Sequence, residues 1–145
     1  MIIMKNSKDI LSSVLKTTQM GQVGIRSVTP YATTAELKNA LRDQLAEYNC
    51  IENQAQNIAS SFGWQLKNLN PMTKMMSQMY AKTNLSFGNV DSKIAAMMVQ
   101  GNTRGIIKGL KNKHHSGTVE SQILTIAQRL IDCEESNIKQ MQGFI

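Results

Sequence analysis

The sequence predicts an all-α protein, and three observations lead to this fold class. Apolar residues recur at steps of three and four over most of the chain, as on the buried face of a helix. No stretch alternates polar and apolar residues for long, and aromatic residues make up only 5% of the chain, so β-strands are not indicated. The chain has 145 residues, enough for one core, and its 41% hydrophobic content excludes a disordered chain. We therefore expect residues 1–145 to form a single helical-bundle domain.

The first predicted helix covers residues 7–27. Its inward row has the 4-3 spacing of a bundle seam and consists of Leu11, Leu15, Thr18, Gln22 and Ile25. Gly21 and Gly24 lower the helix propensity of its second half or let another helix approach closely. Thr29-Pro30 lies in the connection that follows.

The second predicted helix is the most periodic segment. Thr33-x-x-Glu36 has the spacing of a capping box, and Gly63 is placed to end the helix in the left-handed conformation. Between them the 4-3 rhythm is kept by Leu37, Leu41, Gln44, Tyr48, Ile51, Ala55, Ile58 and Phe62.

The third helical segment starts at Asn70-Pro71, a capping residue followed by the proline preferred in the first turn. Its apolar pattern fades around residues 86–89, then resumes at Val90 and continues to Leu110. One helix of about 40 residues would span ~60 Å, which is long for this domain. The segment is therefore expected to be long and kinked or broken near Gly88, with residues 71–87 as a helical crossover if it breaks.

Residues 111–117 are predicted to be a polar loop, and a last helix is expected from residue 118 or 119 to about residue 142. Its main row is Val119, Ile123, Ile126, Leu130 and Cys133. Four amphipathic segments joined by short links indicate a helix bundle.

Two blocks of the sequence carry a resemblance to a known family. One runs from Glu36-Leu-Lys through Gln44-Leu-Ala-Glu-Tyr48 to Ile58-Ala-Ser-Ser-Phe-Gly-Trp64; the other runs from Asn70-Pro-Met through Ser92-Lys-Ile-Ala-Ala-Met-Met-Val-Gln-Gly101 to Gly105-Ile-Ile107. Together they resemble small bacterial proteins of the ferritin-like four-helix-bundle superfamily, most specifically over residues 94–107. The resemblance implies a ferritin-like four-helix bundle in the cytoplasm. Relatives tend to carry histidine where this chain has Lys93 and glutamate where it has Ala96, so the resemblance does not carry a metal role over.

A ferritin-like di-metal site needs two carboxylates and two Glu-x-x-His pairs. The only histidines, His114 and His115, are adjacent in the predicted loop, and the corresponding pairs read Glu47-x-x-Cys50 and Glu134-x-x-Asn137 or Glu135-x-x-Ile138. We therefore expect no metal, no cofactor and no catalytic residue. The alternative is an atypical carboxylate and cysteine metal or redox site made of Glu47, Cys50, Glu134 and Glu135.

Polar residues interrupt the predicted seams near mid-helix: Thr18, Gln22, Gln44 and Tyr48. They are expected to form a buried hydrogen-bonded layer that fixes helix register. A vestigial ligand cavity is the alternative.

Methionine is abundant, and Met72, Met75, Met76 and Met79 form a stripe at helical spacing. The stripe is expected to fill the core or an oligomer interface; a partner-binding face and a soft-metal site are the other interpretations. Gly101 and Gly105 are spaced for a close helix crossing or a dimer contact. A homo-oligomer, most simply a dimer, is the expected state.

The formal net charge is +6, and much of the excess lies in one basic region. Its members are Arg104, Lys108, Lys111, Lys113, His114 and His115. A solvated loop is the simplest interpretation, and contact with nucleic acid or anionic lipid is the alternative. No aromatic stacking platforms lie beside these charges.

The two cysteines, Cys50 and Cys133, lie on apolar rows, so buried, inert thiols in a reducing, cytoplasmic compartment are expected. No run approaches the length of a membrane span. The function predicted from sequence is a non-catalytic structural or interaction protein. The alternatives are the metal or redox protein described above and a basic nucleic-acid-associated protein.

Overall fold

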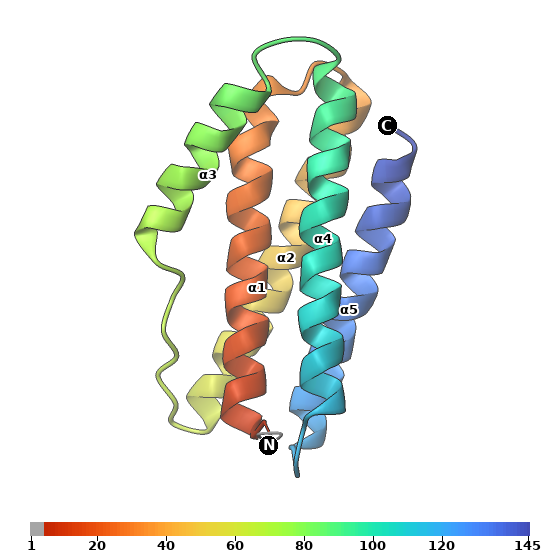
Figure 1. Ribbon diagram of the computed structural model, residues 1–145. Coiled ribbons are helices and arrows are strands. Elements are labelled where there is room, and N and C mark those ends of the chain that lie inside the picture. The colour runs from red at the N-terminus through yellow and green to blue at the C-terminus, as the bar shows by residue number, and fades with distance from the viewer. Residues whose placement is uncertain (1–4) are drawn as a thin grey trace.

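The chain folds into five α-helices, as the computed structural model shows for residues 5–145 (Figure 1). The helices are α1 (Ser7–Val28), α2 (Ala35–Ser61), α3 (Pro71–Asn84), α4 (Val90–His114) and α5 (Ser121–Gln142), with a 3-10 turn, η1 (Thr29–Tyr31), after α1. The only β-type pairing within residues 5–145 is an isolated bridge between Lys5 and Ser116. The predicted all-α class is therefore confirmed.

Four helices, α1, α2, α4 and α5, lie side by side, and α3 packs on the outside of α1 (Figure 1). Helices α1 and α5 run in one direction, while α2 and α4 run in the other. Because α2 and α4 are parallel, the chain must return along the full bundle between them, and residues 62–70 and α3 make this crossover.

The start of α2 differs by one residue from the predicted capping box. Thr34 is the N-cap, and its hydroxyl accepts a hydrogen bond from the Leu37 amide at 3.3 Å. The Thr33 and Thr34 amides donate instead to the Asp91 carboxylate, at 2.8 and 3.0 Å. These bonds outweigh the desolvation of Asp91 and hold its pKa below the ordinary 3.8. Asp91 therefore ties the α1–α2 turn to the start of α4.

The predicted left-handed cap at Gly63 is confirmed. Gly63 has a φ of 70°, and its amide bonds to the Ser60 carbonyl while the Trp64 amide bonds to the Ala59 carbonyl. This pair of bonds is a Schellman motif, which directs the chain away from α2 into the crossover.

Helices α3 and α4 are separate, and Gly88, with a φ of 86°, lies between them. Helix α4 continues through His114, so the prediction that residues 111–117 form a loop is wrong at its start. Lys111, Lys113 and His114 lie in the last turn, where positive charge interacts favourably with the helix dipole. The last helix begins at Ser121, slightly later than predicted.

The core lies where the four bundle helices meet. Its fully buried side chains come from the predicted rows and include Leu11, Leu15, Leu37, Leu41, Ile51, Ile94, Ile123 and Ile126. Within residues 5–145, no helix combines the length and apolarity that a membrane span requires.

Candidate functional site

A buried polar cluster lies in the bundle between α2, α4 and α5. It consists of Tyr48, Asn102, Glu134 and Asn137, which are 2%, 5%, 2% and 6% exposed. The Tyr48 hydroxyl lies 2.7 Å from Asn102 Oδ1 and 2.9 Å from Glu134 Oε2. Asn137 Nδ2 donates to the same Asn102 oxygen at 3.1 Å. The cluster therefore joins three helices through side chains alone.

The hydrogen bonds of the cluster favour a protonated Glu134. Asn102 Nδ2 donates to the Met98 carbonyl at 2.7 Å, so the Asn102 oxygen must face Tyr48 as an acceptor. The single phenol proton of Tyr48 can fill that bond. The same hydroxyl lies 2.9 Å from Glu134 Oε2, so its one proton has two oxygen neighbours, and a protonated Glu134 carboxyl group would complete both bonds.

Burial gives the same protonation state. It raises the pKa of Glu134 to about 8, from an ordinary 4.5. Burial, reinforced by the neighbouring Glu134, also raises the pKa of Tyr48 far above its ordinary range. Near pH 7 the cluster is therefore a neutral carboxylic acid hydrogen-bonded to a neutral phenol.

Two glycines make room for the cluster. A Cβ atom at Gly21 of α1 would lie 2.5 Å from the Tyr48 ring, and a Cβ atom at Gly105 of α4 would overlap the Glu134 carboxyl group. Gly105 therefore belongs to the contact between α4 and α5 inside the chain, whereas a Cβ atom at Gly101 would meet nothing. Both glycines could be recognised from sequence as positions of close helix approach. The sequence did not indicate that Gly21 faces Tyr48 and Gly105 faces Glu134.

The four polar residues predicted to lie on the seams are all buried, but only Tyr48 joins the cluster. Thr18 donates to the Leu15 carbonyl of its own helix at 2.6 Å. Gln22 donates to Glu52 at 3.1 Å, and Gln44 donates to Gln140 at 2.8 Å. The residues of the predicted layer thus take part in four separate sets of bonds. Sequence reasoning missed Asn102, which continues the inward row of Ile94 and Met98 on α4.

One oxygen of the cluster has no hydrogen-bond partner within residues 5–145. Glu134 Oε1 is buried against Gly105, and the only other such oxygen is Gln44 Oε1. An unpaired buried acceptor costs on the order of 1–3 kcal/mol. A neutral carboxyl group reduces that cost, because its second oxygen carries no charge.

The residues of the alternative metal site do not come together. Glu47 and Cys50 lie on α2 beside Arg129 of α5, whose guanidinium is 2.9 Å from Glu47 Oε1 and 3.4 Å from Cys50 Sγ. Glu134 points into the cluster, and Glu135 is exposed to solvent. Over residues 5–145, no three His, Cys, Asp or Glu side chains are close enough together to hold a metal ion.

Arg129 and Glu47 line an open groove of about 810 Å³ between α2 and α5. The bonds to Cys50 and Glu47 raise the pKa of Arg129 above its ordinary value, so it stays charged. Cys50 is exposed, which corrects the prediction that both thiols are buried. Cys50 lies on the side of α2 that faces Arg129 of α5, not on the side that faces the core. Cys133 is buried, and burial raises its pKa to about 12.

The donors at the bundle centre do not fit a di-metal site. Such a site uses four carboxylates and two imidazoles, whereas the cluster offers one carboxyl group, a phenol and two amides. Both histidines lie at the end of α4, outside the bundle centre.

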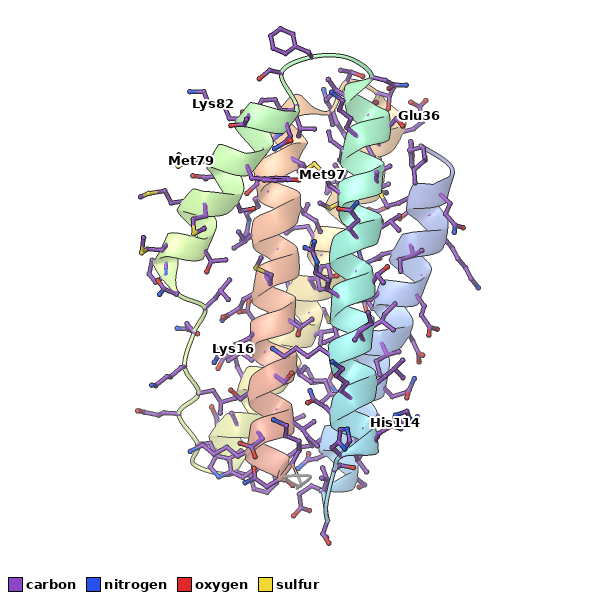
Figure 2. All side chains as sticks on the ribbon, viewed as in Figure 1. Lys16, Glu36, Met79, Lys82, Met97 and His114 are labelled. Atoms are coloured by element: carbon purple, nitrogen blue, oxygen red, sulfur yellow. The ribbon has the colours of Figure 1, made fainter. Side chains whose placement is uncertain are left out.

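The methionine stripe of α3 faces solvent. Met72, Met75, Met76 and Met79 are 63%, 61%, 66% and 64% exposed, which corrects the prediction that they fill the core. Helix α3 contacts α1 through its opposite side, where Ala81 is buried and Thr73 and Ser77 are half-buried. Figure 2 shows Met79 and Lys82 on this helix, at the flank of the bundle. The apolar face of α3 is therefore its outer face.

The basic residues follow the second half of α4. Arg104, Lys108, Lys111, Lys113 and His114 are exposed, and His115 is half-buried, its carbonyl accepting a bond from the Lys5 amide at 2.7 Å. Lys113 bonds to Gln128 of α5 at 3.2 Å. Part of this basic region thus stabilises the end of α4 and its junction with α5.

Neither the protein-family models, nor the curated proteins, nor the solved structures compared with this chain gave a match.

Proposed function

We propose that this protein is a ferritin-like helical bundle that works as an interaction protein, through the outer face of α3. The direction of the helices supports the ferritin-like part of the proposal: α1 and α5 oppose α2 and α4, with one long crossover, as in ferritin-like bundles. The bundle centre is used for a neutral hydrogen-bonded cluster, whose donors suit helix register better than metal ligation.

The single observation that carries the proposal is the orientation of α3. The other bundle helices turn their apolar rows inward, but α3 presents four methionines to solvent and packs through alanine, serine and threonine. Tyr80 beside the stripe and Phe87 after the helix are also exposed, at 56% and 81%. Contiguous exposed apolar surface of this kind marks interaction sites, and methionine suits them because its side chain adapts to different partners.

The crossover does not need this pattern for folding. Polar residues on the outer face of α3 would leave its contacts with α1 unchanged, because those contacts come from the other side of the helix. The stripe is therefore best explained by a surface that becomes covered when the protein is at work. Both a second copy and a different protein satisfy the proposal at this level.

Site-specific photocrosslinking tests the proposal. A photoreactive amino acid at Met76, on the outer face of α3, is compared in the host cell with the same amino acid at Lys139, an exposed position on α5. A discrete adduct from position 76 that is absent from position 139 is expected, identified by mass as a second copy or a partner. Equal, diffuse labelling from both positions would contradict the proposal.

A further inference from the structure

The charges of the bundle are divided unequally between its helices. Helices α1 and α4 carry eight lysines and arginines against two acids, a balance of +6. Helices α2 and α5 carry four lysines and arginines against seven acids, a balance of −3. Because α1 and α4 lie next to each other, on the near side of the bundle in Figure 1, the excess positive charge is concentrated on one side of the molecule.

A row of three cations runs along the second half of α4. Arg104, Lys108 and Lys111 are spaced at i, i+4 and i+7, so they lie on one side of the helix, and all three are exposed. None of them forms an ion pair within residues 5–145, where the one such pair joins Glu47 and Arg129. The row spans about 10 Å along the helix.

The row borders α1, which extends the positive surface. Asn112 of α4 donates to the Ser13 hydroxyl of α1 at 2.8 Å, and Lys16, half-buried, lies one turn further along α1. At the end of α4 the Lys5 amide bonds to the His115 carbonyl at 2.7 Å, which brings another exposed lysine to the same end of the bundle.

Few acids lie near this surface. The chain has no acidic residue between Asp91 and Glu120. Asp91 is bonded to the α1–α2 turn, and Asp9, the one acid of α1, accepts a bond from the Asn6 amide at 3.3 Å. Glu135 of α5 is exposed but forms no ion pair with the row. The cations of α4 are therefore free to pair with an anion from outside the chain.

We infer that the α1–α4 face, defined by Lys16, Arg104, Lys108 and Lys111, binds the phosphate backbone of a nucleic-acid duplex. The steps of four and three residues in the row correspond to about 6 and 4.5 Å along the helix. A duplex presents a phosphate about every 3.4 Å along each strand, so a row of cations at this spacing meets a repeated negative charge. Backbone contacts carry no sequence information, so binding is expected to be independent of sequence. This face is on other helices than the α3 face of the proposed function.

Three other occupants fit this face less well. Single strands bind by stacking on aromatic side chains, and neither α1 nor α4 contains one. A helix that binds lipid presents a broad apolar face, whereas the large apolar side chains exposed on α4 are only Ile107 and Leu110. A second copy would have to offer the acids of α2 and α5, but Glu47 is paired with Arg129 and Glu134 is buried.

The test is the salt dependence of duplex binding by the full chain, measured by fluorescence anisotropy with two labelled DNA duplexes of unrelated sequence. Equal affinities are expected, with a slope of log affinity against log salt of about −3.6, the value for four phosphate contacts. R104Q/K108Q/K111Q should weaken binding at least about tenfold at low salt and change the slope to about −0.9. The matched control K38Q/R42Q/K139Q removes the same charge from exposed positions of α2 and α5 and should keep the parent slope.

Four results would overturn the inference. One is no binding of either duplex at low salt, and another is an equal loss of affinity in the two triple variants, which would show attraction to net charge alone. Binding to phosphatidylglycerol vesicles without duplex binding would assign the face to lipid. Salt-sensitive self-association in sedimentation experiments that R104Q/K108Q/K111Q abolishes, without duplex binding, would assign it to a second copy.

Discussion

Glu134 shows how a single residue can be misread from sequence. By its spacing to Asn137 it resembles part of a metal-ligand pair, and its charge suggests a surface position. In the fold it is 2% exposed and bonded to Tyr48. Tyr48 and its burial were predictable, because the seam of α2 passes through it. The contact with Glu134 was not, because it depends on the rotation of α5 and on the space left by Gly105.

The protonated state of Glu134 predicts a specific pH dependence of stability. Its pKa is raised to about 8 in the folded state from an ordinary 4.5, so the folded state holds the proton more tightly than the unfolded state. Its contribution is therefore fully present below about pH 4.5 and is lost as the pH rises toward 8. Glu134→Gln keeps a hydrogen-bond donor to Tyr48 but cannot ionise.

We expect Glu134→Gln to match the parent chain within about 1 kcal/mol near pH 4.5 and to be more stable by a few kcal/mol at pH 8.5, since each pKa unit corresponds to about 1.4 kcal/mol. Urea unfolding across this range measures the difference. Parallel stability curves for the two proteins would show that Glu134 is ionised in the fold.

Gly105 predicts a second effect at the residue scale. Gly105→Ala would push a methyl group into the Glu134 carboxyl group and should destabilise the fold by roughly 1–3 kcal/mol. Gly101→Ala, one turn earlier on the same helix, meets no atom and should stabilise it by up to about 1 kcal/mol. Thermal or urea unfolding compares the two variants; similar effects from both would argue against the packing of α4 on α5 described here.

At the scale of the element, α3 shows what periodicity can and cannot predict. The methionine spacing predicts a helix here, and the Asn70-Pro71 start is confirmed as its cap and first turn. The same spacing does not reveal whether the stripe faces the core or solvent. That choice depends on the opposite side of the helix, where alanine, serine and threonine allow close packing on α1. The small residues of that inner side were the missing signal.

The orientation of α3 can be tested by stability alone. Replacing Met72, Met75, Met76 and Met79 with glutamine should change the free energy of unfolding by less than about 0.5 kcal/mol per site, because exposed positions tolerate substitution. Ala81→Leu on the buried side should cost about 1–3 kcal/mol through overpacking. The reverse order in urea unfolding would place the methionines in the core.

At the scale of the whole molecule, local chemistry predicts the helices better than it predicts their arrangement. The helix content and the end of α2 at Gly63 follow from local chemistry, so they were predictable. The end of α4 was misplaced because lysines and histidine look like loop residues, although they favour a helix C-terminus. A crossover at residues 71–87 was expected if the third segment broke, and α3 and α4 are separate helices. The parallel course of α2 and α4, which puts α3 outside the bundle, is encoded in no local pattern.

The central claim is that this bundle acts through its surface and that its centre serves to hold the helices in register. Elemental analysis of tag-free protein, produced with iron and manganese supplied, tests this most directly. We expect metal far below one ion per chain, with no change in Glu134→Gln. Stoichiometric iron or manganese in the parent chain that disappears in Glu134→Gln would contradict the claim.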